Sequence, residues 1–246
     1  MFELLSDGQR LWLTLLLIVW AALLFGGFIL GKTWTDGTRR MPVWTRMASS
    51  LTLVIAAWSL AIFTQGMDAA AYAVLIAIGM TLGFLGDLFM AKLIPVSWNV
   101  LGGMAAFGLG HVAYIIAIAW LGNTAGLDDS AARWGAWIAW LIVGALGWFV
   151  AVWRGARDRT ALHSAALPYA LLLASTAGAA TGLALQTSLL VGLAVGAGLF
   201  LLSDLILAAR LFRGVFFPLI DDVVWLTYGP AQMLIVYSIN AALYTL

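Results

Sequence analysis

LFLLSDLILAAR, residues 199–210, places one carboxylate, Asp204, inside an otherwise apolar run. A charged side chain at bilayer depth costs at least about 2.5–3.5 kcal/mol, so intramembrane acids usually face a protein interior or a wet cavity. An earlier stretch, LGFLGDLFMAK at residues 82–92, repeats the order of small residue, aspartate, leucine, two apolar residues and alanine around Asp87. The chain therefore carries two acids in matched apolar frames.

The composition predicts a membrane protein. The 246 residues are 64% hydrophobic and only 9% charged, with a mean hydropathy of +1.03, whereas soluble domains are roughly 45–50% apolar and 25% charged. A net charge of +1 without a separate basic cluster gives no indication of a nucleic-acid partner. The lack of cysteine excludes disulfides, thiol catalysis and thiolate metal sites.

At about 20 residues per crossing, the chain accommodates eight membrane spans with short connectors. The first apolar run follows Glu3 and Asp7 rather than a basic region and has full spanning length, so we interpret it as a span and not as a cleaved signal peptide. We expect an all-α, polytopic bundle in which residues 1–246 form a single integral membrane domain. The predicted spans are 11–30, 47–65, 70–91, 97–121, 134–153, 161–186, 189–209 and 222–244.

The distribution of basic residues predicts the orientation. Of the 12 lysine and arginine residues, all but Arg10 and Arg133 lie in or beside the odd-numbered connectors. Because cytoplasmic loops carry the excess of basic residues, both termini are expected on the non-cytoplasmic side. We expect an integral protein of a bacterial inner membrane.

The two acidic frames are predicted to lie at one depth. Asp87 precedes Lys92 by five residues and Asp204 precedes Arg210 by six, which puts each carboxylate roughly 7–9 Å inside the cytoplasmic boundary at ~1.5 Å per residue. Lys92 and Arg210 are off the i+3 and i+4 positions and can snorkel to the headgroups, which argues against simple ion pairs. The frames are four spans apart, so the copies run in the same direction, as in a weak parallel four-plus-four repeat.

The last predicted span carries a polar stripe. Asp221, Trp225, Tyr228 and Gln232 recur at helical spacing on one face. Asp221 and its neighbour Asp222 alone would suit a helix N-terminus. Two hydrogen-bonding side chains deeper in the same face, Tyr228 and Gln232, favour a polar cavity over simple interhelical bonds.

The remaining candidates are isolated polar residues. A lone buried histidine such as His111 more often hydrogen-bonds within a core than acts as a ligand or an acid, and both interpretations stay open. The only other histidine, His163, lies in another predicted span, so we expect no metal and no cofactor. Ser203 has no predictable base and no G-x-S-x-G elbow, which favours a small partner of Asp204 over a nucleophile.

We expect one cavity to collect these groups. Asp87 and Asp204 should face each other across a space open to the cytoplasmic leaflet, lined also by His111, Tyr228 and Asn99. Asp87 and Asp204 are the candidate catalytic residues. The candidate substrate-binding residues are His111, Tyr114, Tyr228, Gln232, Asn99 and Ser203.

Four motifs together resemble the YhhN / TMEM86 lysoplasmalogenase family: FLGDLFM at 84–90, FGLGHVAY at 107–114, LLSDLILA at 201–208 and TYGPAQ at 227–232. Where the family pattern has Lys-Pro before the second span, this chain has Met41-Pro42. The resemblance implies a lysophospholipid substrate drawn from membrane lipids. It also implies hydrolysis of the vinyl ether bond of lysoplasmalogens to a fatty aldehyde and a glycerophospho head group, with Asp87 and Asp204 in the active site.

The residue chemistry is compatible with that reaction. Vinyl ether hydrolysis needs a proton delivered to carbon and water added to the resulting cation, hence one neutral acid and one ionised carboxylate. Two acids in an apolar site can divide in this way, whereas ester hydrolysis would require a nucleophile and an oxyanion hole that we do not find. A proton-coupled transporter of lipids or small molecules, and a non-catalytic lipid-binding protein, remain alternatives.

Overall fold

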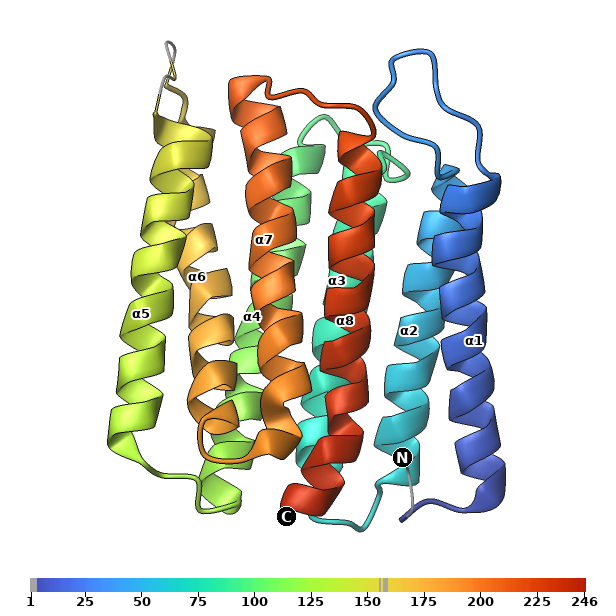
Figure 1. Ribbon diagram of the computed structural model, residues 1–246, viewed down its shortest axis with the longest axis vertical. Helices are drawn as coiled ribbons and strands as arrows, with labels where there is room; N and C mark the ends of the chain where they lie inside the picture. Colours follow the sequence, from blue (N-terminus) through green and yellow to red (C-terminus); the bar gives the residue numbers. More distant parts are fainter. Residues whose placement is uncertain (1–3, 155, 157–158) are drawn as a thin grey trace.

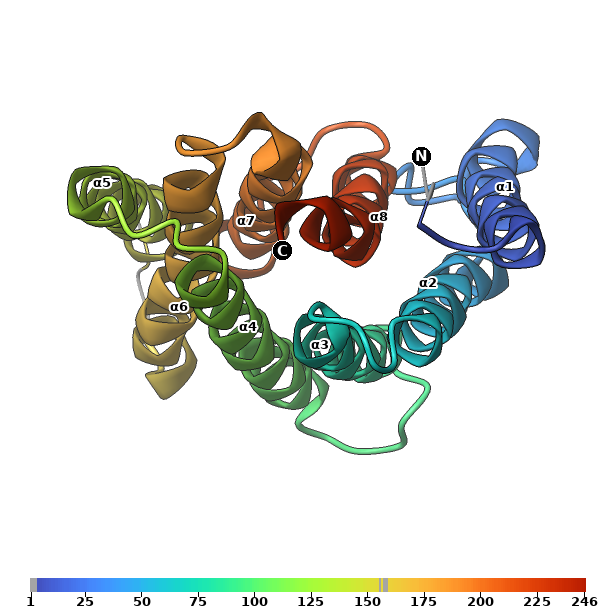
Figure 2. The same cartoon turned by 90° about the horizontal axis from the view of Figure 1, so that it is seen from below.

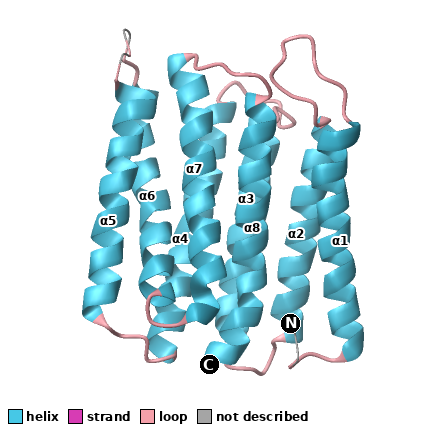
Figure 3. Ribbon diagram, in the orientation of Figure 1, coloured by secondary structure: helices cyan, strands magenta, loops and turns pink. Residues whose placement is uncertain are grey.

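The computed structural model describes residues 4–154, 156 and 159–246, and in this part of the chain every regular element is helical (Figure 3). Glu3 and Arg157, used above for the signal-peptide and charge arguments, lie outside the described residues. The α-helices are α1 (Asp7–Leu30), α2 (Val43–Phe63), α3 (Ala70–Met90), α4 (Asn99–Thr124), α5 (Ser130–Trp148), α6 (Ala161–Ala184), α7 (Val191–Arg213) and α8 (Ile220–Thr245), with a π-helical turn η1 (Phe149–Trp153) after α5 and a 3-10 turn η2 (Ser188–Leu190) before α7.

The predicted all-helical membrane bundle is confirmed. Each helix begins and ends within about one turn of the corresponding predicted span. Within the described residues, seven helices, α1 to α7, are long and apolar enough to cross a membrane. The eighth, α8, has 26 residues, but its polar residues lower its hydropathy. It contacts α1, α2, α3 and α7, so it is packed among other helices.

The helices run up and down side by side, with the two termini at the same end of the bundle (Figure 1). At the other end lie the connectors 31–42, 91–98 and 214–219, which carry Lys32, Arg39 and Lys92. We call this the basic end. The view along the bundle shows α7 and α8 on one side of a curved row formed by α2, α3, α4 and α6 (Figure 2). Helices α3 and α7 run in the same direction, as the spacing of the two acidic frames predicts.

Local sequence explains several helix ends. Ser6 begins α1 with a capping box, in which it and Gln9 each satisfy a backbone N–H of the other. Asp129 accepts hydrogen bonds from the first N–H groups of α5. α7 ends at Gly214 in the left-handed conformation (φ 65°), which glycine adopts without steric cost. The chain then turns at once towards α8.

We expect a reporter fused after Leu246 to give a non-cytoplasmic signal, because the basic end should lie in the cytoplasm and the termini lie at the opposite end. A matched fusion within the 214–219 connector should give a cytoplasmic signal. The reverse pattern would show the orientation to be wrong, and a cytoplasmic signal from both would show that α8 does not cross.

Candidate functional site

A cavity of about 630 Å³ opens at the basic end between α2, α3, α7 and α8. Asp87 of α3 and Asp204 of α7 both line it, so the structure brings the two motif acids to one space. The other lining residues are Asp36, Thr38, Arg39, Val43, Arg46, Met47, Met90, Ala91, Lys92, Phe107, Ser203, Leu207, Arg210, Leu211, Asp221, Val224, Trp225 and Tyr228.

Asp87 is 3% exposed and sits at the end of a directed chain of hydrogen bonds. Its Oδ2 accepts from the Ser50 hydroxyl (2.5 Å) and from the Tyr228 hydroxyl (3.1 Å). Tyr228 in turn accepts from the amide of Gln232 (3.1 Å), whose Oε1 accepts from Tyr114 (2.9 Å). Donors from α2, α4 and α8 are thus oriented towards one carboxylate on α3.

Glycines on α3 make room for this chain. A Cβ at Gly83 would lie 2.6 Å from the amide nitrogen of Gln232, and one at Gly79 would lie 2.2 Å from the ring of Tyr114. One turn further, a Cβ at Gly86 would lie 2.8 Å from the ring of Phe107. The three glycines share one face of the helix. Because glycine has no side chain, polar and aromatic side chains of α4 and α8 can pack directly against α3 at these three positions.

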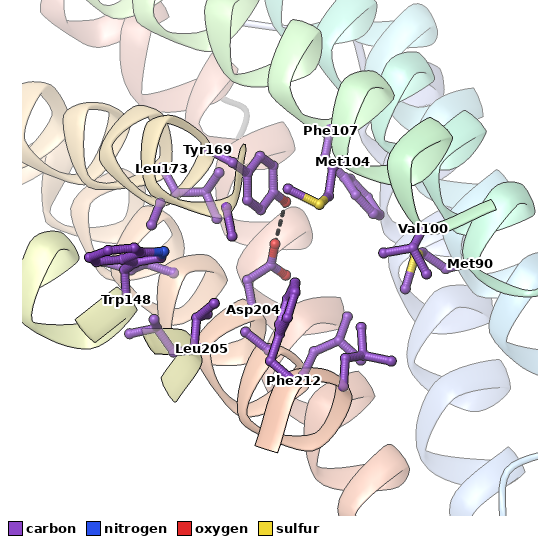
Figure 4. A pocket seen from close by; sticks show the side chains of 17 residues that line it. Met90, Val100, Met104, Phe107, Trp148, Tyr169, Leu173, Asp204, Leu205 and Phe212 are labelled. Atoms are coloured by element: carbon purple, nitrogen blue, oxygen red, sulfur yellow. Dashed lines mark hydrogen bonds between the residues drawn. The ribbon is translucent and has the colours of Figure 1, made fainter. Parts of the chain in front are cut away.

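Asp204 has different surroundings. It is half-buried and accepts a hydrogen bond from the hydroxyl of Tyr169 on α6 (Figure 4). The neighbouring Arg210 pairs with Asp221 instead, so the ion pair considered from the sequence does not form. Asp204 also borders a second, apolar pocket of about 60 Å³ between α4, α6 and α7, which shares Met90, Phe107, Leu207 and Leu211 with the larger cavity. Asp204 therefore stands where a polar space meets an apolar one.

A cluster of aromatic rings forms the inner wall. The Phe107 ring centre lies 6.0 Å from those of Phe200 and Tyr228, and Phe200 and Tyr228 are 5.1 Å apart. All three pairs are edge-to-face, the arrangement that aromatic quadrupoles favour. These rings fix Tyr228 so that its hydroxyl reaches Asp87.

The connector between α1 and α2 is tied to the start of α8. Both carboxylate oxygens of Asp222 accept backbone hydrogen bonds, from Arg40 N (2.5 Å) and Met41 N (3.1 Å). The backbones also pair, Leu219 N with Gly37 O and Asp221 N with Thr38 O. We call these four bonds the loop clamp. Within this connector, hydrogen bonds from the Thr38 backbone and hydroxyl lower the pKa of Asp36 below its usual value, so the cavity rim holds a carboxylate as well as cations.

The other predicted site residues are nearby but differ in position. Ser203 lines the cavity and donates to the Val224 carbonyl (2.9 Å), so it is a packing residue and not a nucleophile paired with a base. Tyr114 and Gln232 lie behind Tyr228 rather than at the cavity surface. Among the described residues, no group of three or more acids, histidines or cysteines could hold a metal ion.

The expectation that His111 and Asn99 line the cavity is wrong. His111 is 1% exposed, bonds the Thr176 hydroxyl through Nδ1 (2.8 Å) and packs edge-on against Phe200, which lies between it and the cavity wall formed by Tyr228. Asn99 begins α4 and donates to the Val96 carbonyl (2.6 Å). Neither residue is part of the cavity lining.

Three site residues escaped the sequence analysis. Arg46 was assigned to a connector, but it lies in the first turns of α2 and faces the cavity. Tyr169 belongs to a span without a recognisable motif, although a tyrosine beside Pro168 in an apolar run is itself a signal. Ser50 is one of two adjacent serines in α2 and gave no indication of which acid it would meet.

Comparison with protein-family models gives one match, the YhhN family, over residues 41–239. The chain belongs to the YhhN family. The matched segment includes both acidic frames and runs from the end of the first connector to the last two turns of α8, so the family model covers nearly all of the cavity. Comparisons with curated proteins and with solved structures give no match.

We expect Asp222→Ala to destabilise this YhhN-family protein. The side chain is 1% exposed, and its removal leaves two backbone N–H groups without acceptors, at about 1–3 kcal/mol each. The thermal midpoint in detergent should fall by several degrees, whereas Asp128→Ala, on the exposed connector before α5, should leave it unchanged. Equal midpoints for the two variants would show that the loop clamp does not hold the fold.

Proposed function

We propose that this protein is a membrane-embedded hydrolase that cleaves the vinyl ether bond of lysoplasmalogens, with Asp87 and Asp204 dividing the acid and base roles. One observation carries the proposal: two carboxyl groups that form no salt bridge with any described residue border one cavity, and one of them also borders an apolar pocket. Membership of the YhhN family, whose resemblance to lysoplasmalogenases was noted from the motifs, supports the same reaction.

The two environments suit different roles. Asp87 accepts two hydrogen bonds on Oδ2, which leaves Oδ1 to accept a proton from a water in the cavity. Asp204 accepts one bond, from Tyr169, and borders the apolar pocket. We assign Asp204 as the acid that protonates the hydrocarbon chain and Asp87 as the base that activates water.

The reaction balances with these two groups and one water. Asp204 gives its proton to the alkenyl carbon distal to oxygen, and the adjacent carbon becomes an oxocarbenium ion. Water adds to that carbon while Asp87 takes a proton from the water, which forms a hemiacetal. Collapse of the hemiacetal releases a fatty aldehyde and the glycerol hydroxyl of the head-group product, and the proton held by Asp87 returns through the cavity to Asp204.

The shape of the site supports a single-chain lipid. The first carbons of its hydrocarbon chain would lie in the apolar pocket beside Leu205 and Phe212, and its polar part in the larger cavity towards the basic end (Figure 4). The ether bond would then lie between Asp204 and Asp87. Gln232, expected from the sequence to reach the substrate, would act by holding Tyr228 against Asp87.

We expect Asp87→Asn and Asp204→Asn each to reduce aldehyde release from lysoplasmalogen by at least ~10²–10⁴-fold, the usual contribution of a general acid or base. Binding of the lysolipid should persist, so kcat falls more than KM rises. Asp128→Asn, on an exposed connector, is the matched control. Full activity in both site variants would remove the carboxylates from the mechanism.

We expect turnover in D2O to place one deuterium on the aldehyde carbon next to the carbonyl, because the chemical step transfers a solvent-derived proton to that carbon. Mass spectrometry of the trapped aldehyde measures it, and unlabelled aldehyde incubated with the protein in D2O controls for exchange. Aldehyde without deuterium would exclude protonation at carbon, and ester or phosphodiester products would reassign the reaction.

The same assay separates the other classes of function. An enzyme releases aldehyde in detergent, a transporter moves substrate only between two compartments, and a lipid-binding protein does neither. The cavity lining comes from the basic end alone, which favours a site that lipids enter and leave on one side over a path across the membrane.

A further inference from the structure

Arg46 is a buried cation in the wall of the cavity. The residue is 8% exposed and lines the cavity from α2. Its Nε has no hydrogen-bond partner among the described residues. The guanidinium lies 5.5 Å from the centre of the Trp225 ring, a weak cation–π contact. A buried guanidinium is normally paired and hydrogen-bonded, because leaving it uncompensated costs several kcal/mol.

The surrounding charges do not compensate it. Among the described residues, no carboxylate forms a salt bridge with Arg46. Asp222 is engaged by the backbone in the loop clamp and Asp87 by Ser50 and Tyr228. The donors of Arg46 are therefore available to a group that enters the cavity.

Two further features near Arg46 attract an anion. Arg39 also lines the cavity, and its Nε is likewise buried without a partner, while its guanidinium stacks 3.7 Å above the Trp34 ring. α2 begins at Val43, another lining residue, and its N-cap Pro42 offers no side-chain acceptor. The first backbone N–H groups of a helix lack intrahelical acceptors and favour phosphate there.

We propose that Arg46, with Arg39 at the rim, binds the phosphodiester of the head group of a single-chain lipid. The inference rests on the proposed function for the identity of the lipid. It adds a binding site for the phosphate group, which Asp87 and Asp204 do not contact. One guanidinium can donate two parallel N–H groups to two phosphate oxygens, so two arginines that line one cavity, each with an Nε that lacks a partner among the described residues, match a phosphodiester. In this arrangement the phosphate of the lipid lies at Arg46 and its ether bond lies further inside the cavity. Asp204 and the apolar pocket follow on the far side of the ether bond.

The test uses ligands that cannot be hydrolysed, so binding is measured without turnover. The probes are a saturated 1-O-alkyl lysophosphatidylethanolamine and the 1-O-alkylglycerol of equal chain length, which lacks the phosphate. Kd is measured for both on the purified full-length protein by native mass spectrometry. We expect the phosphate-bearing lipid to bind at least about 10-fold more tightly, as the contribution of a charge-assisted hydrogen bond predicts.

Arg46→Met should abolish this preference, bringing the two Kd values within about twofold while leaving the Kd of the alkylglycerol unchanged. Lys32→Met removes the same charge from an exposed position in the connector that precedes α2 and should keep the preference. If Arg46→Met does not fold, Arg46→Lys, which keeps the charge but loses the planar fork, should reduce the preference by a smaller factor.

Three results would overturn the assignment. One is equal binding of the two probes by the unmodified protein, and another is a full preference in every folded Arg46 variant. The third is displacement of the lysolipid by equal concentrations of glycerophosphoethanolamine or inorganic phosphate, which would indicate a site for soluble anions. Absence of aldehyde release would refute the proposed hydrolase instead, and would leave the binding comparison intact.

Discussion

A carboxylate buried within a helical bundle must be given hydrogen-bond donors by other helices, and the site depends on this requirement at Asp87. α3 cannot supply them itself, because its own backbone N–H groups are used within the helix. Ser50 and Tyr228 meet the requirement from α2 and α8, and Tyr228 is oriented by Gln232 and Tyr114. Four helices are thereby held in one arrangement around a single oxygen.

The polar character of α8 follows from the same requirement. Its tyrosine and amide face α3 and α4, and Asp222 at its start faces the first connector. A helix so polar would be a poor lipid-facing span, and its position among α1, α2, α3 and α7 gives every one of these groups a protein partner or the cavity. The hydrogen bonds at the site require polar residues on α8, and the position of α8 among other helices allows them.

Much of this site was predictable because acids are costly in a membrane. Asp87 and Asp204 stand out in apolar frames, and the stripe through Tyr228 and Gln232 follows from helical spacing. The partners of these residues were not predictable, since Ser50 and Tyr169 meet the acids only through the rotation of α2 and α6 in the bundle. Arg46 was misassigned because sequence cannot distinguish a connector charge from one that turns inward in the first turns of a helix. His111, attractive by residue type, bonds Thr176 behind the aromatic wall.

The glycines of α3 have a mechanical consequence. Gly79, Gly83 and Gly86 form three notches, and side chains of two other helices occupy them: Tyr114 and Phe107 from α4, and Gln232 from α8. Because side chains of α4 and α8 fill the space beside all three glycines, α3 can rotate or slide only if these side chains move out of the way together. Alternating-access transport needs such movements between helices. The acid on α3 is therefore carried by a helix that is closely fitted to two neighbours, and we expect the cavity beside it to keep its shape when a ligand enters.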